Sequence, residues 1–235
     1  MTSPLAALIF DVDGTLAETE EAHRVAFNEA FRQHALPWEW DLPLYKALLE
    51  TSGGKERMRA YASRFDQDRL NHPDFGALVD RLHRDKTGLY TQMVVKGGVP
   101  LRPGIQEVIL EARSMGIRLA VATTTTRANV NALLEGATKG AGHEWFEMMA
   151  CSDDAPNKKP DPQVYNLVLT KMGLAADACL AIEDSLNGVN AAVAAGIPVV
   201  VTKSQFTESP AYPGALGVYT DLSATSLADL HALLR

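Results

Sequence analysis

The feature that most constrains this chain is a short apolar run, residues 5–10, which ends in Asp11-Val12-Asp13-Gly14-Thr15. A run that is short and apolar throughout predicts a strand buried on both faces of a parallel sheet. Side chains that follow such a strand project into the crevice where open α/β sheets bind ligands. Because Asp11 and Asp13 are two residues apart, an extended backbone puts both carboxylates on one face, where a bound cation or a shared proton relieves their repulsion.

Three interpretations compete for these two aspartates. Asp and Gly are common turn formers, so the motif can be an ordinary turn. A calcium loop of the EF-hand kind does not fit the spacing, since Ala22 stands where that loop needs a Glu. The third interpretation is a nucleophilic aspartate beside a magnesium site. The motifs further along the chain decide between the turn and the nucleophile.

A repeated pattern of helix, glycine and short apolar strand begins at about residue 101. Gly116, Gly173 and Gly196 stand where the C-terminus of a helix favours a left-handed residue. The predicted strands that follow these glycines cover residues 117–122, 179–182 and 197–201. This repeat predicts an α/β fold with a doubly wound, Rossmann-like parallel sheet.

A helical pattern without a convincing strand fills the chain between the first strand and this repeat. Thr19 is expected to cap the first helix, whose first turn carries Glu20 and Glu21. Further helices are predicted at about 42–50, 55–65 and 74–95. We therefore expect a helical cap, residues 17–96, inserted into a Rossmann-like core made of residues 1–16 and 97–235.

Composition limits the classes of partner. The 235 residues carry a net charge of -7 and their basic residues do not cluster, so we expect no nucleic-acid binding. No apolar run is long enough to span a membrane, and residues 1–4 do not begin a signal peptide, so we expect no membrane association and a cytoplasmic location. Cys151 and Cys179 are predicted to be buried free thiols, and we expect a monomer.

Polar residues also follow two of the later predicted strands. Thr123 and Thr124 offer hydroxyls and amides that suit a phosphate oxygen, and Glu183 and Asp184 add the oxygen ligands that Mg²⁺ prefers. Lys159 lies between these two motifs in sequence. Taken alone, each motif can be a polar turn or a solvated lysine. Taken together they predict magnesium-dependent phosphoryl transfer, in which a carboxylate attacks a phosphate whose charge is neutralised by Mg²⁺ and a lysine.

These motifs, in this order and with a helical insert after the first, resemble the haloacid dehalogenase superfamily of phosphatases and phosphomutases. The resemblance implies that Asp11 is the nucleophile that becomes an aspartyl-phosphate, and that Asp13 is the general acid and base. It implies phosphate binding by Thr123 and Lys159. The magnesium ligands that it implies are Asp11, the backbone oxygen of Asp13, Glu183 and Asp184. Asp13 argues against dehalogenase activity, since true dehalogenases of the superfamily lack this second Asp.

A closer resemblance is to the CbbY proteins, sugar-phosphate phosphatases related to β-phosphoglucomutase. It rests on Leu16–Glu20, Gly53–Arg57, Ala122–Thr125 and Glu183–Gly188. It implies removal of one phosphate from xylulose-1,5-bisphosphate, an inhibitor of Rubisco. The alternatives are a phosphomutase of the β-phosphoglucomutase kind and, in a different class, a non-catalytic sugar-phosphate-binding protein.

Several residues of the predicted cap suit a second, non-reacting phosphate of such a sugar bisphosphate. The amides, hydroxyls and ammonium group that suit it belong to Thr51, Ser52, Gly53, Gly54 and Lys55. Lys86 on the last predicted cap helix can add positive charge, Glu18 can bind sugar hydroxyls, and Tyr45 can line the pocket. The alternatives for these residues are a helix-start loop, a solvated helix face, and ordinary first-turn and core positions.

Overall fold

The computed structural model describes residues 5–209 and 211–234; the first four residues of the predicted core, on which the signal-peptide assessment rests, lie outside the described residues. At its centre is a six-stranded sheet in the order β3-β2-β1-β4-β5-β6, with every neighbouring pair parallel. The strands are β1 Ala7–Phe10, β2 Arg118–Ala122, β3 Met148–Ala150, β4 Cys179–Glu183, β5 Val199–Thr202 and β6 Gly217–Tyr219. This is the predicted doubly wound α/β sheet.

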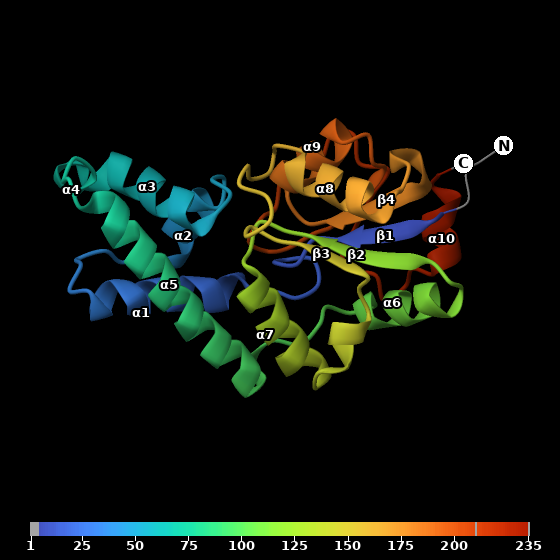
Figure 1. The fold of residues 1–235 in the computed structure, drawn as a ribbon, viewed down its shortest axis with the longest axis horizontal. Helices are drawn as coiled ribbons and strands as arrows, with labels where there is room; N and C mark the ends of the chain where they lie inside the picture. The colour runs from blue at the N-terminus through green and yellow to red at the C-terminus, as the bar shows by residue number, and fades with distance from the viewer. Residues whose placement is uncertain (1–4, 210, 235) are drawn as a thin grey trace.

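Helices cover both faces of this sheet, with α8 and α9 on one face and α6 and α7 on the other (Figure 1). Their bounds, with those of the last helix and the short 3-10 helices, are α6 Ile105–Ser114, α7 Arg127–Thr138, η2 Ala141–Glu144, α8 Gln163–Met172, η3 Ala176–Ala178, α9 Leu186–Ala194 and α10 Leu227–Ala232. Side chains of β1 alternate between two hydrophobic clusters: Leu8 and Phe10 pack on the α6 and α7 side, and Ala7 and Ile9 pack on the α8 and α9 side. All four residues are buried, which explains why the run is apolar throughout.

The sequence pattern does not predict the two outer strands, β3 and β6. Each has three residues and β6 is only partly buried, so neither carries the continuous apolar run that identifies an inner strand. The predicted inner strands are shifted by at most two residues at either end. Gly116, Gly173 and Gly196 have φ values of 73°, 62° and 73°, so the predicted left-handed residues after the helices are confirmed.

A bundle of helices lies beside the sheet (Figure 1). It consists of α1 Glu20–Gln33, α2 Leu42–Leu48, α3 Gly54–Phe65, α4 Gln67–Leu70 and α5 Phe75–Met93, followed by the π-helical turn η1 Val94–Gly98. The bundle has its own hydrophobic cluster, in which Phe27, Phe31, Trp40 and Tyr45 are buried. A helical cap is therefore present in the fold, and the boundaries proposed for it, residues 17–96, stay a prediction.

Thr19 differs from its prediction. It occupies the N-cap position of α1, but its side chain makes no capping hydrogen bond. Instead its hydroxyl donates to Oδ1 of Asp13 at 2.5 Å. The predicted cap is wrong because the charged carboxylate of Asp13 accepts a stronger hydrogen bond than the backbone groups at the start of the helix offer.

Cys151 and Cys179 are buried and free, as predicted. Burial raises the pKa of their thiols to about 12 and about 11, so both stay neutral at physiological pH. In the part of the chain that the structure describes, no helix is both long enough and apolar enough to cross a membrane.

Candidate active site

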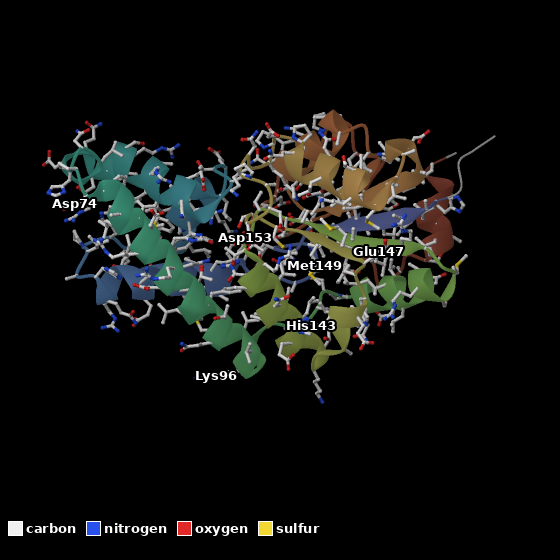
Figure 2. All side chains as sticks on the ribbon, in the orientation of Figure 1. Asp74, Lys96, His143, Glu147, Met149 and Asp153 are labelled. Atoms are coloured by element: carbon white, nitrogen blue, oxygen red, sulfur yellow. The ribbon has the colours of Figure 1, made fainter. Side chains whose placement is uncertain are left out.

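The carboxyl ends of the inner strands face the helical bundle. Glu147, just before β3, and Asp153, just after it, are labelled in Figure 2 and show this strand running toward the bundle. The strand register aligns Phe10 of β1 with Val121 of β2 and Ile182 of β4. The polar residues that follow these strands therefore meet at one edge of the sheet, where a pocket is lined by both the core and the bundle.

Three buried carboxylates meet at this edge of the sheet, and two of them, Asp11 and Asp184, line the pocket. One oxygen each from Asp11, Glu183 and Asp184 lies within 4.8 Å of the other two. Burial raises the pKa of Asp11 to about 7, and burial together with the neighbouring carboxylates raises the pKa of Asp184 well above its usual value. Three carboxylates held together away from water are unfavourable unless a cation joins them. Since carboxylate oxygens are the preferred ligands of hard divalent cations, this donor set fits a metal ion.

Lys159 reaches the same carboxylates from the loop before α8. Its Nζ donates to Oδ1 of Asp11 at 2.7 Å, to Oε1 of Glu183 at 2.5 Å and to the carbonyl oxygen of Ala122 at 2.8 Å. Burial disfavours the charged ammonium, but the two carboxylates outweigh burial and raise the pKa of Lys159. Lys158 instead donates to two backbone carbonyls of its own loop, so only Lys159 of this pair reaches the carboxylates.

Asp13 belongs to a chain of side chains that extends into the bundle. Its Oδ1 lies 3.0 Å from Nε2 of His23, and Nδ1 of His23 lies 2.6 Å from Nζ of Lys86 on α5. The His23 ring stacks on Tyr90 with 4.0 Å between centroids. Burial would raise the pKa of Asp13, but His23, the Thr19 hydroxyl and Lys86 outweigh it and lower this pKa to about 2. Burial lowers the pKa of Lys86 to about 7, so the chain joins an ionised carboxylate to a lysine that titrates near neutral pH.

The four threonines after β2, residues 123–126, line the core side of the pocket. Oγ1 of Thr123 accepts a hydrogen bond from the backbone N–H of Thr125 at 3.2 Å, which holds this turn against the pocket. The last of the four caps α7. The predicted phosphate-binding residues Thr123 and Thr124 therefore lie in the same pocket as Asp11.

The bundle supplies a positively charged wall. Ser52, Gly53 and Gly54 line the pocket where α3 begins, and Arg57 lines it one turn later. Arg57 is 8% exposed; one guanidinium nitrogen donates to the Tyr45 hydroxyl at 3.2 Å, and Nε has no hydrogen-bond partner among the described atoms. A guanidinium that lines the pocket next to the first amides of a helix suits an anionic group of a ligand.

Two predicted members of this wall lie outside the pocket lining. The side chain of Lys55 is 41% exposed and its Nζ pairs with Asp80 at 2.6 Å on the bundle surface. Lys55 lines a neighbouring cavity instead. Thr51 directly precedes the lining residue Ser52 but does not itself line the pocket. The positive group that reaches the pocket from α3 is therefore Arg57.

Glu18 and Tyr45 also lie outside the pocket lining. Glu18 accepts a hydrogen bond from the Ser204 hydroxyl at 2.8 Å and lies 3.6 Å from Nε of Arg102. Tyr45 is fully buried and its hydroxyl donates to Oε2 of Glu20 at 2.6 Å. Both side chains support neighbouring residues, while the predicted Lys86 lines the pocket directly.

The sequence pattern does not single out Glu20, His23 or Arg57, although all three line the pocket. Glu20 reads as a first-turn acid, and His23 lies on the buried face of α1. A usable signal was present, because Glu20, His23 and the pocket residue Phe27 follow the i, i+3, i+7 spacing of one helix face. Two polar residues on an otherwise apolar stripe indicate a site rather than a core.

Comparison with known proteins adds the family. A family profile described as haloacid dehalogenase-like hydrolase matches residues 5–196. The plasmid-encoded protein CbbY of Cupriavidus necator is 48% identical over 221 residues, which are 93% of this chain and 86% of that protein. A crystal structure of a CbbY mutant from Rhodobacter sphaeroides in complex with xylulose-1,5-bisphosphate has a TM-score of 0.89 at 40% identity, covering 96% of this chain and 99% of that one. The fold is shared with a β-phosphoglucomutase from Clostridium difficile, with a TM-score of 0.80 at 16% identity, covering 98% of this chain and 97% of that one.

Proposed function

Since this chain belongs to the haloacid dehalogenase-like hydrolases and, within them, to the CbbY-type sugar phosphatases, we propose that it hydrolyses xylulose-1,5-bisphosphate to xylulose-5-phosphate and inorganic phosphate, with Mg²⁺ as cofactor. One observation carries the proposal. Oδ1 of Asp11, one of three clustered carboxylates, lies 2.7 Å from Nζ of Lys159. A second acid, Asp13, lines the same pocket. A nucleophile, a fixed positive charge and an acid in one pocket are what phosphoryl transfer to a carboxylate requires.

In the first proposed step, a carboxylate oxygen of Asp11 attacks phosphorus, and the bond between phosphorus and the sugar oxygen breaks. Lys159 balances the charge on the transferring group, while Thr123 and Thr124 offer hydroxyls and amides to its oxygens. Asp13 gives a proton to the departing sugar oxygen. In the second step Asp13 takes a proton from water, the water oxygen attacks phosphorus, and phosphate leaves as Asp11 is restored.

The metal site is proposed to use Asp11, Glu183, Asp184 and the backbone oxygen of Asp13. When bound there, Mg²⁺ supplies charge neutralisation for the phosphoryl oxygens. Without the metal ion, burial outweighs Lys159 and holds the pKa of Asp11 at about 7, so part of this group is protonated and not nucleophilic at neutral pH. The buried cluster therefore needs positive charge before Asp11 can act.

The proton that Asp13 needs is proposed to come from Lys86 in the bundle, through the ring of His23. Lys86 donates toward Nδ1 of His23, and Nε2 of His23 donates toward Asp13. A shift of both protons leaves Lys86 neutral, His23 neutral and Asp13 protonated. The shift is unfavourable while the pKa of Asp13 is about 2, and the negative charge of a phosphate bound beside Asp13 makes it less unfavourable by raising that pKa.

The second phosphate of the substrate is proposed to bind Arg57 and the amides of Gly53 and Gly54. Arg57 is buried and lines the pocket, where a hydrogen bond to the Tyr45 hydroxyl at 3.2 Å holds its guanidinium in place. Lys55 offers a weaker alternative, because its ammonium already pairs with Asp80 on the surface. Binding energy from this remote phosphate can help to hold the bundle closed over the core and exclude water from the first step.

Phosphate release from a substrate panel tests the proposal. The panel contains xylulose-1,5-bisphosphate, ribulose-1,5-bisphosphate, glucose-1-phosphate and phosphoglycolate, each with Mg²⁺ and with EDTA. We expect the highest kcat/KM for the xylulose compound, and only with Mg²⁺. A flat profile would remove the substrate assignment, and an isomeric sugar phosphate without free phosphate would favour the mutase.

A matched pair of variants tests the second-phosphate site. Arg57→Ala is expected to raise KM for xylulose-1,5-bisphosphate by about tenfold or more, the cost of a lost hydrogen bond to a charged group, and to leave KM for p-nitrophenyl phosphate unchanged. Lys55→Ala removes a cation from the same helix and is expected to change both values by less than about twofold. A larger effect of Lys55→Ala than of Arg57→Ala would reverse the assignment.

A further inference from the structure

A short loop of the core, Ser204–Thr207, contacts both the carboxylate cluster and the helical bundle. The loop follows β5 directly. The Thr207 hydroxyl donates to Oδ2 of Asp184, one of the three clustered carboxylates, and also lies 3.2 Å from its backbone oxygen. Since a carboxylate can rotate about its bond to Cβ, a hydrogen bond to one oxygen fixes where the other oxygen points. Thr207 therefore sets the orientation of Asp184.

The neighbouring residue, Phe206, packs into the bundle rather than into the core. Phe206 is 7% exposed and belongs to the hydrophobic cluster of the bundle. The other buried members of this cluster come from residues 27–82, so Phe206 is its one buried contribution from the core among the described residues. The ammonium of Lys46, on α2, lies 5.5 Å from the centre of the Phe206 ring. The position of Phe206 therefore depends on how the bundle packs against the core.

Ser204 holds the base of this loop in place. Its side chain is buried and its hydroxyl donates to Oε2 of Glu18 at 2.8 Å. The hydroxyl oxygen of Ser204 also accepts a hydrogen bond from the backbone N–H of Phe206 at 3.2 Å. Glu18 belongs to the connection between β1 and α1, so the base of the loop is tied to the point where the chain enters the bundle. With one end fixed, a displacement of Phe206 has to be taken up by the residue after it, Thr207.

We propose that Phe206 and Thr207 are positioning residues that couple packing of the bundle to the orientation of Asp184. When the bundle is packed on Phe206, Thr207 holds Asp184 ready to bind the metal ion. When that packing is lost, Thr207 releases the carboxylate and the metal site loosens. This inference rests on the proposed metal-dependent function only through the metal ion, and it is tested by metal binding rather than by turnover.

Isothermal titration of the full-length protein with Mg²⁺ alone tests the coupling. Thr207→Val keeps the shape of the side chain and removes the hydroxyl, and it is expected to weaken Mg²⁺ binding about five- to tenfold. Thr207→Ser restores the hydroxyl and is expected to bind within about twofold of the wild type. Phe206→Ala, which touches no carboxylate of the cluster, is expected to weaken Mg²⁺ binding by about fivefold, a coupling of ordinary size between two sites.

Phe65→Ala is the matched control, since Phe65 is an aromatic residue of the same bundle that is 60% exposed and lies on α3. It is expected to bind Mg²⁺ like the wild type. Wild-type affinity in Phe206→Ala would overturn the coupling, and wild-type affinity in Thr207→Val would overturn the role of the hydroxyl. If Phe206→Ala does not fold, Phe206→Leu tests the same coupling, with a smaller expected loss of Mg²⁺ affinity. A wild type that binds Mg²⁺ but releases no phosphate would refute the proposed function alone.

Discussion

Replacing Asp11 with Asn is expected to stabilise the metal-free protein while it abolishes turnover. Asp11 is buried beside Glu183 and Asp184, and its ionised form is unfavourable there despite the ion pair with Lys159. Asn is neutral, nearly the same size, and still offers an oxygen to the Lys159 ammonium. The substitution therefore removes a destabilising charge without opening a cavity.

The size of this effect follows from the pKa of Asp11. Burial raises this pKa from 3.8 to about 7 on folding, so the group stabilises the fold fully below pH 3.8, and that contribution is lost as the pH rises through 7. At 1.36 kcal/mol for each pH unit, the carboxyl group of Asp11 opposes folding by about 4 kcal/mol at pH 8, where it is ionised in the folded protein, and by about 2 kcal/mol at pH 5, where folding has to protonate it. For a chain of this length the gain at pH 8 corresponds to a rise in Tm of roughly 8–16 °C.

Thermal unfolding in EDTA, followed by circular dichroism at pH 8 and pH 5, measures the effect. We expect a gain in Asp11→Asn that is about twice as large at pH 8 as at pH 5. Asp80→Asn is the control, because it makes the same chemical change at an exposed ion pair of the bundle and is expected to leave Tm nearly unchanged at both pH values. An Asp11→Asn protein with the wild-type Tm, or a lower one, at pH 8 would refute the account of strained carboxylates.

Three further predictions concern the neighbours of this site. Lys86→Ala is expected to lower kcat for xylulose-1,5-bisphosphate by about 100-fold, the usual value of general acid catalysis. It should affect kcat for p-nitrophenyl phosphate little, because that leaving group needs no proton. Equal losses of kcat for both substrates in steady-state assays would exclude the proton supply from Lys86 to Asp13. Gly14→Ala is expected to abolish Mg²⁺ binding in calorimetry, because Gly14 has a φ of +80° and an added Cβ would lie 2.2 Å from Oδ2 of Asp184; tight binding would contradict this. Arg102→Ala is expected to cost about 3 kcal/mol of unfolding free energy in urea, since this buried guanidinium serves several backbone carbonyls, and a loss below about 1 kcal/mol would count against that role.

The core of the site was predictable because its residues directly follow buried strands. Once the apolar runs identify parallel inner strands, Asp11, Thr123 and Glu183 must lie at one edge of the sheet, whatever the side-chain details. Lys159 was predictable only from the motif it shares with the family, because it is on a loop whose path the sequence does not specify. The two short outer strands carry too few apolar residues to be recognised.

The bundle side of the pocket could not be predicted with the same success, because it depends on how helices pack against the sheet. Lys55 and Arg57 are two residues apart on α3, so they point in different directions, and the sequence alone does not say which one faces the core. Their burial decides it, with Arg57 at 8% exposed and the side chain of Lys55 at 41%. The contact of His23 with Lys86 joins residues far apart in sequence and follows only from the packing of α1 on α5.

Chemical trapping of the phosphorylated enzyme tests the central claim most directly. The wild type is mixed with xylulose-1,5-bisphosphate and Mg²⁺, quenched in acid within the first turnover and treated with borohydride, which reduces an acyl phosphate to an alcohol. Mass spectrometry of the peptide that ends at Arg24 then reads out residue 11. We predict conversion of Asp11 to homoserine that requires both substrate and Mg²⁺, with Asp13 unchanged. Phosphate release without any conversion of Asp11, or conversion of Asp13 instead, would contradict the account.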